Sequence, residues 1–431
     1  MQKHFNTIFY AIFALGLLFS YFYATNQILT GDQTQMLQKG YLGAYTNSWL
    51  SYGNEASTVG NVPGSLSAYI IGLPIAFWDS PYAPMVFLVL LHVVSFLLLD
   101  SVIKEVYDKN IRLIFLLLYW LNPWFMFENL LYNPSYLFLF AAMHFYSAYN
   151  MRNRSSFFFT FIHILSIGMA MQLHYSWPLL AVISTYLFYR GIIKVNIFGA
   201  LFSFVVIGLS LVPYFQELAV NENIAKNSDK EANDRYIGWG GVHVYPVLKA
   251  FLYWLRYASF IFTNKLIMAA SFEWVSSVQL IQTLATYLYR AVLFIVGAIS
   301  IIFALKANIY VYKRIKSSLL RSSTEVDSQK WILLYVVGTL LAIFTSAVLS
   351  PIIFSYWHLI MIFAFALFPL LTYLQAEVLN SQNIGKLVLF LVIYFSAINL
   401  IASHDSDKYS YKADFEVQTL EYVKTLNIER E

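Results

Sequence analysis

The sequence predicts an all-α polytopic membrane protein, and three observations support that fold class. Of the 431 residues, 59% are hydrophobic and only 12% are charged. The apolar residues form runs close to the roughly 20 residues that a helix needs to cross a bilayer. Polar residues gather between these runs. A soluble protein of this size could not cover so much apolar surface with so few charges.

About eleven transmembrane helices are expected from the lengths of the apolar runs, with further helices at the outer membrane surface. The stretch Ser65–Trp78 is apolar but short, and it contains Gly72 and Pro74, so we expect a re-entrant or interfacial helix there. The chain shows no internal repeat and is interpreted as one integral membrane domain, 1–431. The expected spans are Ile8–Tyr23, Pro84–Val102, Ile111–Phe127, Pro134–Tyr149, Phe157–Leu173, Pro178–Tyr189, Val195–Tyr214, Leu284–Leu305, Trp331–Leu349, Ile352–Leu374 and Leu387–Ile401.

Positive charges predict which ends of the spans face the cytoplasm. With the N-terminus inside, more than half of the 27 Lys and Arg residues fall in inner connections that are nearly all short. Lys104, Lys109 and Arg112 are examples, and short basic loops stay cytoplasmic. A protein with its elaborate loops on one face is expected to work on that face. The outer face then carries residues 29–64, the turn 128–133, residues 216–283 and a polar tail, 403–431.

Composition also excludes several kinds of site. The chain has no cysteine, which removes disulfides, thiolate metal sites and cysteine nucleophiles. The formal net charge is only +4, and no soluble basic domain accompanies the spans, so nucleic-acid binding is not expected. The lipid bilayer is the partner that composition itself predicts.

Two acidic residues on the outer face are the main candidates for catalysis. Asp32 follows the first span, and Glu128 lies in an aromatic run at the end of a later one. A carboxylate beside a hydroxyl or amine acceptor can remove its proton as a sugar carbon is attacked, and paired acids suit an oxocarbenium-like transition state. There are alternatives: Asp32 could start and cap a surface helix, and Glu128 could be an interfacial acid that reaches toward water.

Four further polar residues lie at outer ends of spans and are candidates for substrate binding. They are Asn133, His174, Tyr356 and His358. Asn133 could equally cap the helix expected from Pro134, and a lone histidine is usually a packed, hydrogen-bonded side chain. No metal-ligand spacing accompanies either histidine.

Three basic residues are candidates for binding a lipid phosphate. Lys249 and Arg256 are seven residues apart, which places them on one face of an expected helix among aromatic residues. Arg290 lies near the start of the following span. Cations at the depth of lipid headgroups suit phosphate. The alternative is that these side chains only snorkel to the membrane surface.

The acid after the first span, the long outer loop and the segment Asn61-Val62-Pro63-Gly64-Ser65-Leu66 together resemble the GT-C glycosyltransferases. Within them the chain looks most like glycosyltransferase family 39, in its bacterial protein-mannosyltransferase-like branch, which includes the aminoarabinose transferases. The family's first catalytic acid matches Asp32. The place of its second acid is shared between Glu128 and Asn133.

The resemblance implies a GT-C-like fold with helices at the periplasmic membrane surface. It also implies a bacterial inner-membrane enzyme that takes a sugar from a polyprenyl-phosphate carrier. Transfer to an envelope glycan, lipid or protein would occur on the periplasmic face, normally with inversion. The family often has a lysine where this chain has Val62, which moves the phosphate-binding role to Lys249, Arg256 or Arg290. No cofactor or metal is expected, because the leaving group is already a lipid phosphate held by cations.

Two other functions are alternatives. An O-antigen polymerase or ligase is also polytopic with a large outer loop, but it should depend on outer-loop arginines more than on a carboxylate near the first span. A polysaccharide or lipid transporter (flippase) would need ionisable groups inside the spans. The predicted spans contain few of these: His92, Asp100, His144 and His163.

Overall fold

The computed structural model describes residues 4–56, 60–226, 236–238, 243–262, 266, 272–319, 327–378, 381–428 and 430, so parts of the predicted outer region 216–283 lie outside the described residues. Helices dominate the described residues, and their one sheet is an antiparallel hairpin of two strands. The elements are α1 (Phe5–Thr25), α2 (Gly31–Thr46), β1 (Tyr52–Ala56), β2 (Gly60–Pro63), α3 (Leu66–Phe77), α4 (Ala83–Val106), α5 (Lys109–Tyr119), α6 (Pro123–Met126), η2 (Asn133–Tyr136), α7 (Leu137–Asn150), α8 (Phe157–Met171), α9 (Pro178–Tyr189), α10 (Ile197–Val220), η3 (Glu222–Ala225), α11 (Val244–Tyr257), α13 (Gln279–Leu319), α14 (Ser328–Val348), η4 (Tyr356–Ile362), α15 (Phe363–Tyr373), η5 (Leu374–Val378), α16 (Ser381–His404) and α17 (Phe415–Thr425).

Seven helices in the described part of the chain are long and apolar enough to cross a membrane. They are α1, α4, α10, α14 and α16, most of α13, and the continuous stretch Tyr356–Glu377. The prediction of an all-α, multi-pass membrane protein is confirmed at this level. Each predicted span overlaps helical residues, but α8 and α9 are shorter apolar helices, so the number of about eleven spans stays a prediction.

The predicted span Ile111–Phe127 is not one helix. α5 ends, and the short helix α6 begins at Pro123. Proline lacks the N–H that continues a helix, and it forces the preceding residue into an extended conformation. Asn122 has that conformation, with ψ of 131°. Its side chain accepts a bond from the N–H of Trp124 at 3.0 Å and donates one to the carbonyl of Leu118 at 2.9 Å.

Residues 29–64, which the sequence predicted as a polar outer region, contain α2 and a hairpin. The short helix expected in the stretch Ser65–Trp78 is present as α3, which has 12 residues and is too short to cross a bilayer. α3 packs tightly on α2, because a Cβ on Gly72 would lie 2.7 Å from the carbonyl oxygen of Gly40. The hairpin β1–β2 connects the two helices.

An ion pair joins three helices at the end that the sequence places in the cytoplasm. Asp100 on α4 accepts bonds from Nε and Nη2 of Arg112 on α5, at 2.7 and 2.6 Å. The guanidinium carbon lies 4.6 Å from the ring centroid of Phe9 on α1. A bidentate pair stacked on an aromatic ring fixes the relative position of these helices.

The core and the lipid-facing surface are formed by different helices. Most residues of α5, α7 and α15 are buried. In contrast, the apolar windows of α10 and α13 are only 28% and 22% buried inside the protein. An apolar helix with so little protein cover is expected to face lipid.

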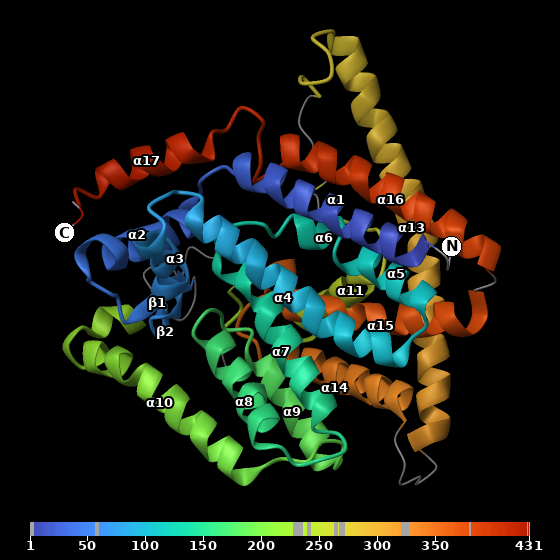
Figure 1. The fold of residues 1–431 in the computed structure, drawn as a ribbon, viewed down its shortest axis with the longest axis horizontal. Helices are drawn as coiled ribbons and strands as arrows, with labels where there is room; N and C mark the ends of the chain where they lie inside the picture. The colour runs from blue at the N-terminus through green and yellow to red at the C-terminus, as the bar shows by residue number, and fades with distance from the viewer. Residues whose placement is uncertain are drawn as a thin grey trace.

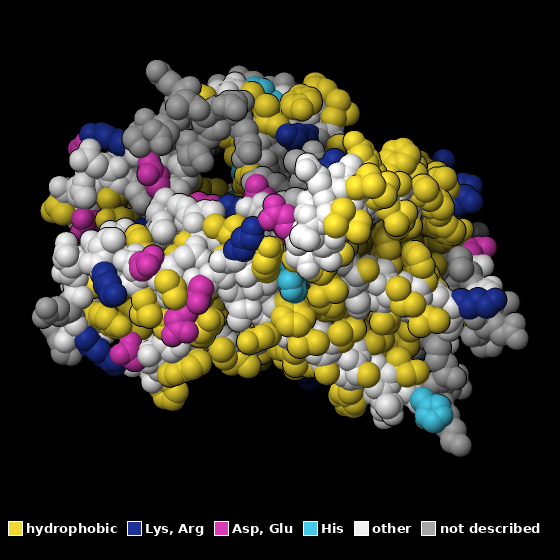
Figure 2. All heavy atoms as spheres, turned by 90° about the horizontal axis from the view of Figure 1, so that it is seen from above, with side chains coloured by type: hydrophobic (Ala, Val, Ile, Leu, Met, Phe, Trp, Pro, Cys, Tyr) yellow, Lys and Arg dark blue, Asp and Glu magenta, His cyan; other side chains and the backbone are white. Residues whose placement is uncertain are grey.

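The two ends of the molecule differ in composition and in the elements they carry. α2, α3, the hairpin, α17 and the C-terminus lie on one side, and the N-terminus lies on the other (Figure 1). Figure 2 shows Asp, Glu, Lys and Arg side chains gathered toward the α2 side, next to a broad hydrophobic surface.

Candidate functional site

A cavity of about 790 Å³ lies between segments that are far apart in the sequence. Its walls come from the first outer region, the segment before and at η2, the loops between α8 and α9 and between α14 and η4, and the C-terminal tail. These are the pieces that the sequence places on the outer face. A cavity of this size suits a small-molecule ligand. The predicted site residues that line it are Asp32, Asn133, His174, Tyr356 and His358.

Asp32 lies in the first turn of α2, where its exposed side chain lines the cavity. The residue is not the helix cap. The N-cap is Thr30, which forms a capping box with Gln33. The Asp32 carboxylate makes no hydrogen bond or ion pair with any described residue. An unpaired carboxylate in a cavity wall is available as an acceptor or as a base.

Two charged residues on the cavity wall were not predicted. Glu55 lies on β1, where its backbone N–H donates to Gln35 Oε1 at 3.0 Å. Lys408 comes from the tail: the N–H of Ile28 donates to its carbonyl at 2.9 Å, and its ammonium donates to Thr30 Oγ1 at 3.3 Å. Lys408 is therefore fixed beside the start of α2. No local sequence pattern identifies either residue as part of a site. The sequence indicates only that both segments lie on the outer face.

Glu128 is fully buried and does not line the cavity. Tyr132, which does line it, donates its hydroxyl to Glu128 Oε2. Burial raises the pKa of Glu128 to about 8, against the bond from Tyr132 and the charge of Lys408, which both lower it. The acid is therefore mainly protonated at neutral pH. Glu128 acts on the cavity through Tyr132, while Asp32 faces the cavity directly.

Asn133 is held in the cavity wall by one strong contact. Its Nδ2 donates to the carbonyl of Leu173 at 2.7 Å. The cap alternative does not hold, because η2 has Tyr132 at its N-cap position and no side-chain cap bond. Asn133 thus connects the segment at η2 to the loop between α8 and α9, which carries His174.

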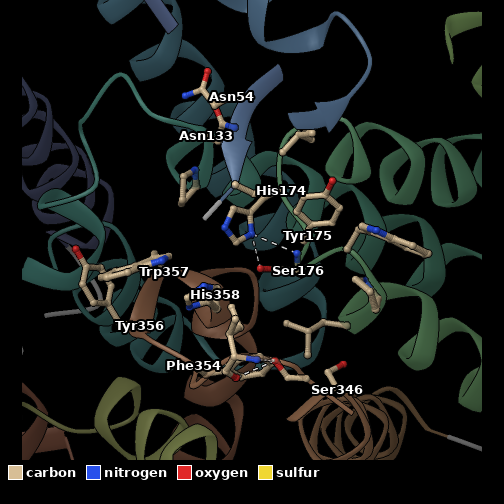
Figure 3. A pocket seen from close by; sticks show the side chains of 18 of the residues that line it. Asn54, Asn133, His174, Tyr175, Ser176, Ser346, Phe354, Tyr356, Trp357 and His358 are labelled. Carbon is tan, nitrogen blue, oxygen red and sulfur yellow. Dashed lines mark hydrogen bonds between the residues drawn. The ribbon is translucent and has the colours of Figure 1, made fainter. Parts of the chain in front are cut away.

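The two predicted histidines lie together in the cavity (Figure 3). His174 Nδ1 accepts the N–H of Ser176 at 3.2 Å, and His358 Nδ1 accepts the N–H of Ser355 at 2.9 Å. A neutral ring with an accepting Nδ1 carries its proton on Nε2. The ring centroids are 5.7 Å apart. Burial lowers the pKa of His174 to about 4, so this ring is neutral at physiological pH, and Tyr356 lines the cavity at the start of the same short helix as His358.

The predicted phosphate-binding cations Lys249, Arg256 and Arg290 do not line the cavity. Arg256 on α11 donates to the carbonyls of Ile261 and Phe262, at 3.2 and 2.6 Å. Lys249 lies on the same helix, and Arg290 is exposed on α13. None of these three cations is therefore part of the cavity wall.

The chemistry of the cavity is that of carboxylates, neutral imidazoles and one ammonium group. In the described part of the chain, no three His, Asp or Glu side chains form a group that could hold a metal ion. No protein family, curated protein or solved structure matches the chain. The functional argument therefore rests on the residues of this cavity.

Glu128 predicts how stability depends on pH. Its pKa of about 8 in the folded protein is above the 4.5 of a free glutamate, so the folded state binds this proton more tightly. The stabilisation is complete below about pH 4.5 and is lost as the pH rises through about 8. The Tm of the purified protein should therefore fall between about pH 5.5 and 8.5. Glu128→Gln cannot ionise and should remove most of this slope; an unchanged slope would contradict the assignment.

Proposed function

We propose that this protein is a bacterial inner-membrane glycosyltransferase of the GT-C class. It moves a sugar from a polyprenyl-phosphate carrier to a cell-envelope acceptor on the periplasmic face, and its N-terminus is cytoplasmic. The observation that carries the proposal is the unpaired carboxylate of Asp32 on the wall of a large cavity in a membrane protein. In this position, Asp32 could act as a base on a substrate that enters the cavity from the membrane.

The walls of the cavity suit a substrate that is part sugar and part lipid. Asp32 and Glu55 supply a polar side. Leu179 and Val182 of α9, with Leu349 at the end of α14, supply an apolar side. A polyprenyl chain entering between spans would contact the apolar side, while its sugar reaches the polar side. The fit between these two chemistries supports a lipid-linked donor.

In the proposed reaction, Asp32 is the general base. The acceptor hydroxyl gives its proton to the Asp32 carboxylate as its oxygen forms a bond to the anomeric carbon. The bond from that carbon to the phosphate oxygen breaks, and its electron pair leaves with the lipid phosphate. Attack from the face opposite the phosphate inverts the anomeric centre. No proton has to be supplied to the leaving group, because the phosphate leaves as an anion.

The remaining wall residues position the reactants. Glu128 orients Tyr132 by the buried hydrogen bond, so its role is positioning rather than direct catalysis. Asn133, His174, Tyr356 and the neighbouring His358 are proposed to bind the sugars, with the Nε2–H of His174 as a donor. The proposal thus keeps both predicted acids but gives them different tasks.

The lipid phosphate needs a cation, and the cavity contains Lys408. We place the phosphate there. The cations Lys249, Arg256 and Arg290, which the sequence predicted for this role, are the alternative, and they would require the phosphate to bind outside the cavity. Arg256 donates to two backbone carbonyls and does not line the cavity, whereas Lys408 lies on the cavity wall, which favours Lys408.

The contacts of the ionisable residues in the spans argue against a transporter. Such a protein needs groups within the membrane that can change their charge or bind substrate. Asp100 is paired with Arg112, and His92, His144 and His163 are all hydrogen-bonded to protein groups. An O-antigen polymerase or ligase should use outer-loop arginines, and no arginine is among the described residues that line the cavity.

Asp32→Asn tests the general base. The variant keeps size and polarity but cannot take a proton, so transfer of sugar from polyprenyl phosphate in membranes should fall by about two to four orders of magnitude. Asp79→Asn is the matched control, because Asp79 is an acid on the same side that is paired with Tyr45 and Arg430 instead of lining the cavity. Full activity in Asp32→Asn, at equal expression, would exclude the base role.

Cysteine labelling tests the orientation, and the native chain has no cysteine to interfere. Ser48 is exposed after α2, and Asn153 is exposed in the connection between α7 and α8. A membrane-impermeant maleimide should label Ser48→Cys in intact spheroplasts and Asn153→Cys only after permeabilisation. The opposite pattern would invert the proposed topology.

Lys408→Gln tests the phosphate site. Binding of farnesyl phosphate to the purified protein should weaken by about ten- to a hundredfold, because a charge-assisted contact is lost. Binding of farnesol, which has no phosphate, should not change. Arg256→Gln is the comparison variant and should bind farnesyl phosphate like the wild type. If Arg256→Gln weakens binding and Lys408→Gln does not, the phosphate belongs with the α11 cations.

A further inference from the structure

One face of α13 is apolar and exposed along the predicted span Leu284–Leu305. Leu288, Ile295 and Ile302 follow one another at intervals of seven residues, which places them on one helical face, and they are 68%, 56% and 52% exposed. Figure 1 shows α13 along one edge of the molecule. Little of the described protein covers this face, so it lies against lipid.

The same face becomes cationic where the span ends. Lys306, Lys313 and Lys316 are exposed, and the exposed side chains of Ile309 and Tyr312 lie between them on this face. The 41 residues of α13 include no Asp or Glu. None of the three lysines makes an ion pair with a residue that the structure describes. The positive charge of this face is therefore open to an anionic ligand.

Contacts on the opposite face of α13 fix the direction in which these lysines point. Val311 and Ile315 pack with Leu333 of α14. Between them, Arg314 Nη2 donates to Gln329 Oε1 at 2.9 Å, at the start of α14. Turning α13 about its axis would break these contacts. The three lysines therefore stay on the outside of the helix bundle.

The lysines lie at the depth of lipid headgroups. The span Leu284–Leu305 is about 33 Å long at about 1.5 Å per residue, close to the roughly 30 Å of the hydrocarbon core of a bilayer. Lys306 therefore lies at the edge of this core. Lys313 and Lys316 follow within three turns, and long lysine side chains can reach back toward the lipid phosphates. Tyrosines such as Tyr312 are typical of the same depth.

We propose that the exposed face of α13 formed by Lys306, Lys313 and Lys316 binds an anionic phospholipid. The ammonium groups contact the headgroup phosphate, and the acyl chains run along the apolar face of the same helix. A lipid with net negative charge is favoured over phosphatidylcholine, whose own choline offsets the charge of its phosphate. These lysines do not line the cavity, so the inference does not depend on the proposed catalytic function.

Fluorescence quenching at a single cysteine tests this preference, because the native chain contains no cysteine. A bimane fluorophore is attached to Ile302→Cys, which lies on the same face as Lys306 and one turn before it, and the full chain is reconstituted in phosphatidylcholine vesicles. Quenching by brominated phosphatidylglycerol and by brominated phosphatidylcholine gives their relative affinity at the label. Phosphatidylglycerol should be favoured about five-fold or more, the gain expected from one lysine at a membrane surface. Equal affinity would overturn the proposal.

A second label position shows whether the preference belongs to α13. Leu209 is 67% exposed on α10, a lipid-facing helix that contains no Lys or Arg. With bimane on Leu209→Cys, the two brominated lipids should bind with about equal affinity. The same preference for phosphatidylglycerol at both positions would contradict a site on α13.

Two triple variants of the Ile302→Cys chain separate a local site from the net charge of this end of the protein. Replacing Lys306, Lys313 and Lys316 by Gln should abolish the preference for phosphatidylglycerol. The matched control replaces Lys104, Lys109 and Arg154 by Gln, which removes the same charge from other exposed positions at the predicted cytoplasmic end, and should keep the preference. Quenching by brominated phosphatidylcholine checks that each variant is inserted. An equal loss of preference in both variants would overturn the assignment to α13.

Discussion

The side chain of Gln27 is the contact on which the geometry of the cavity depends. It is fully buried just after α1, where its Oε1 accepts the N–H of Leu131 at 3.0 Å and Nε2 of Gln33 at 3.1 Å. Its backbone forms a bridge with Tyr409 in the tail. One residue at the end of the first span thus contacts the first turn of α2 and the segment before η2 through its side chain, and the C-terminal tail through its backbone. These contacts hold the first turn of α2, which carries Asp32, against the segment before η2. A buried amide that lost them would be costly.

The segment from residue 120 to residue 136 shows how a membrane protein can bury irregular backbone. Away from water, such backbone is tolerated only where protein groups satisfy its N–H and C=O groups. Asn399 donates to the carbonyl of Leu121 at 2.9 Å, and Tyr409 donates to the carbonyl of Phe127 at 2.7 Å. Amide and hydroxyl side chains therefore satisfy backbone carbonyls here, as the regular hydrogen bonds of a helix would. The segment turns Tyr132 toward the cavity and keeps Glu128 behind it.

The positions of the helices could be predicted from sequence because apolar runs must be buried or face lipid, and the break at Pro123 follows from its missing N–H. Asp32 could be singled out because its place after the first span is a local feature. Glu55 and Lys408 could not, because they reach the cavity through a hairpin and a tail that lack apolar periodicity. The helical spacing of Arg256 and its neighbours fixes a face of α11 but not what that face contacts, so the role of these cations stays a prediction.

The partners of the buried segment have a consequence for the order of events during biosynthesis. Residues 120 to 136 leave the ribosome long before Asn399 and Tyr409 do. Until the last span is made, the carbonyls of Leu121 and Phe127 lack the donors that they have in the finished protein. Insertion of the earlier spans can therefore be complete while the cavity is still unformed. Chains that stop before α16 should insert into the membrane without forming the cavity. The cavity can form only after α16 and the tail have been synthesised.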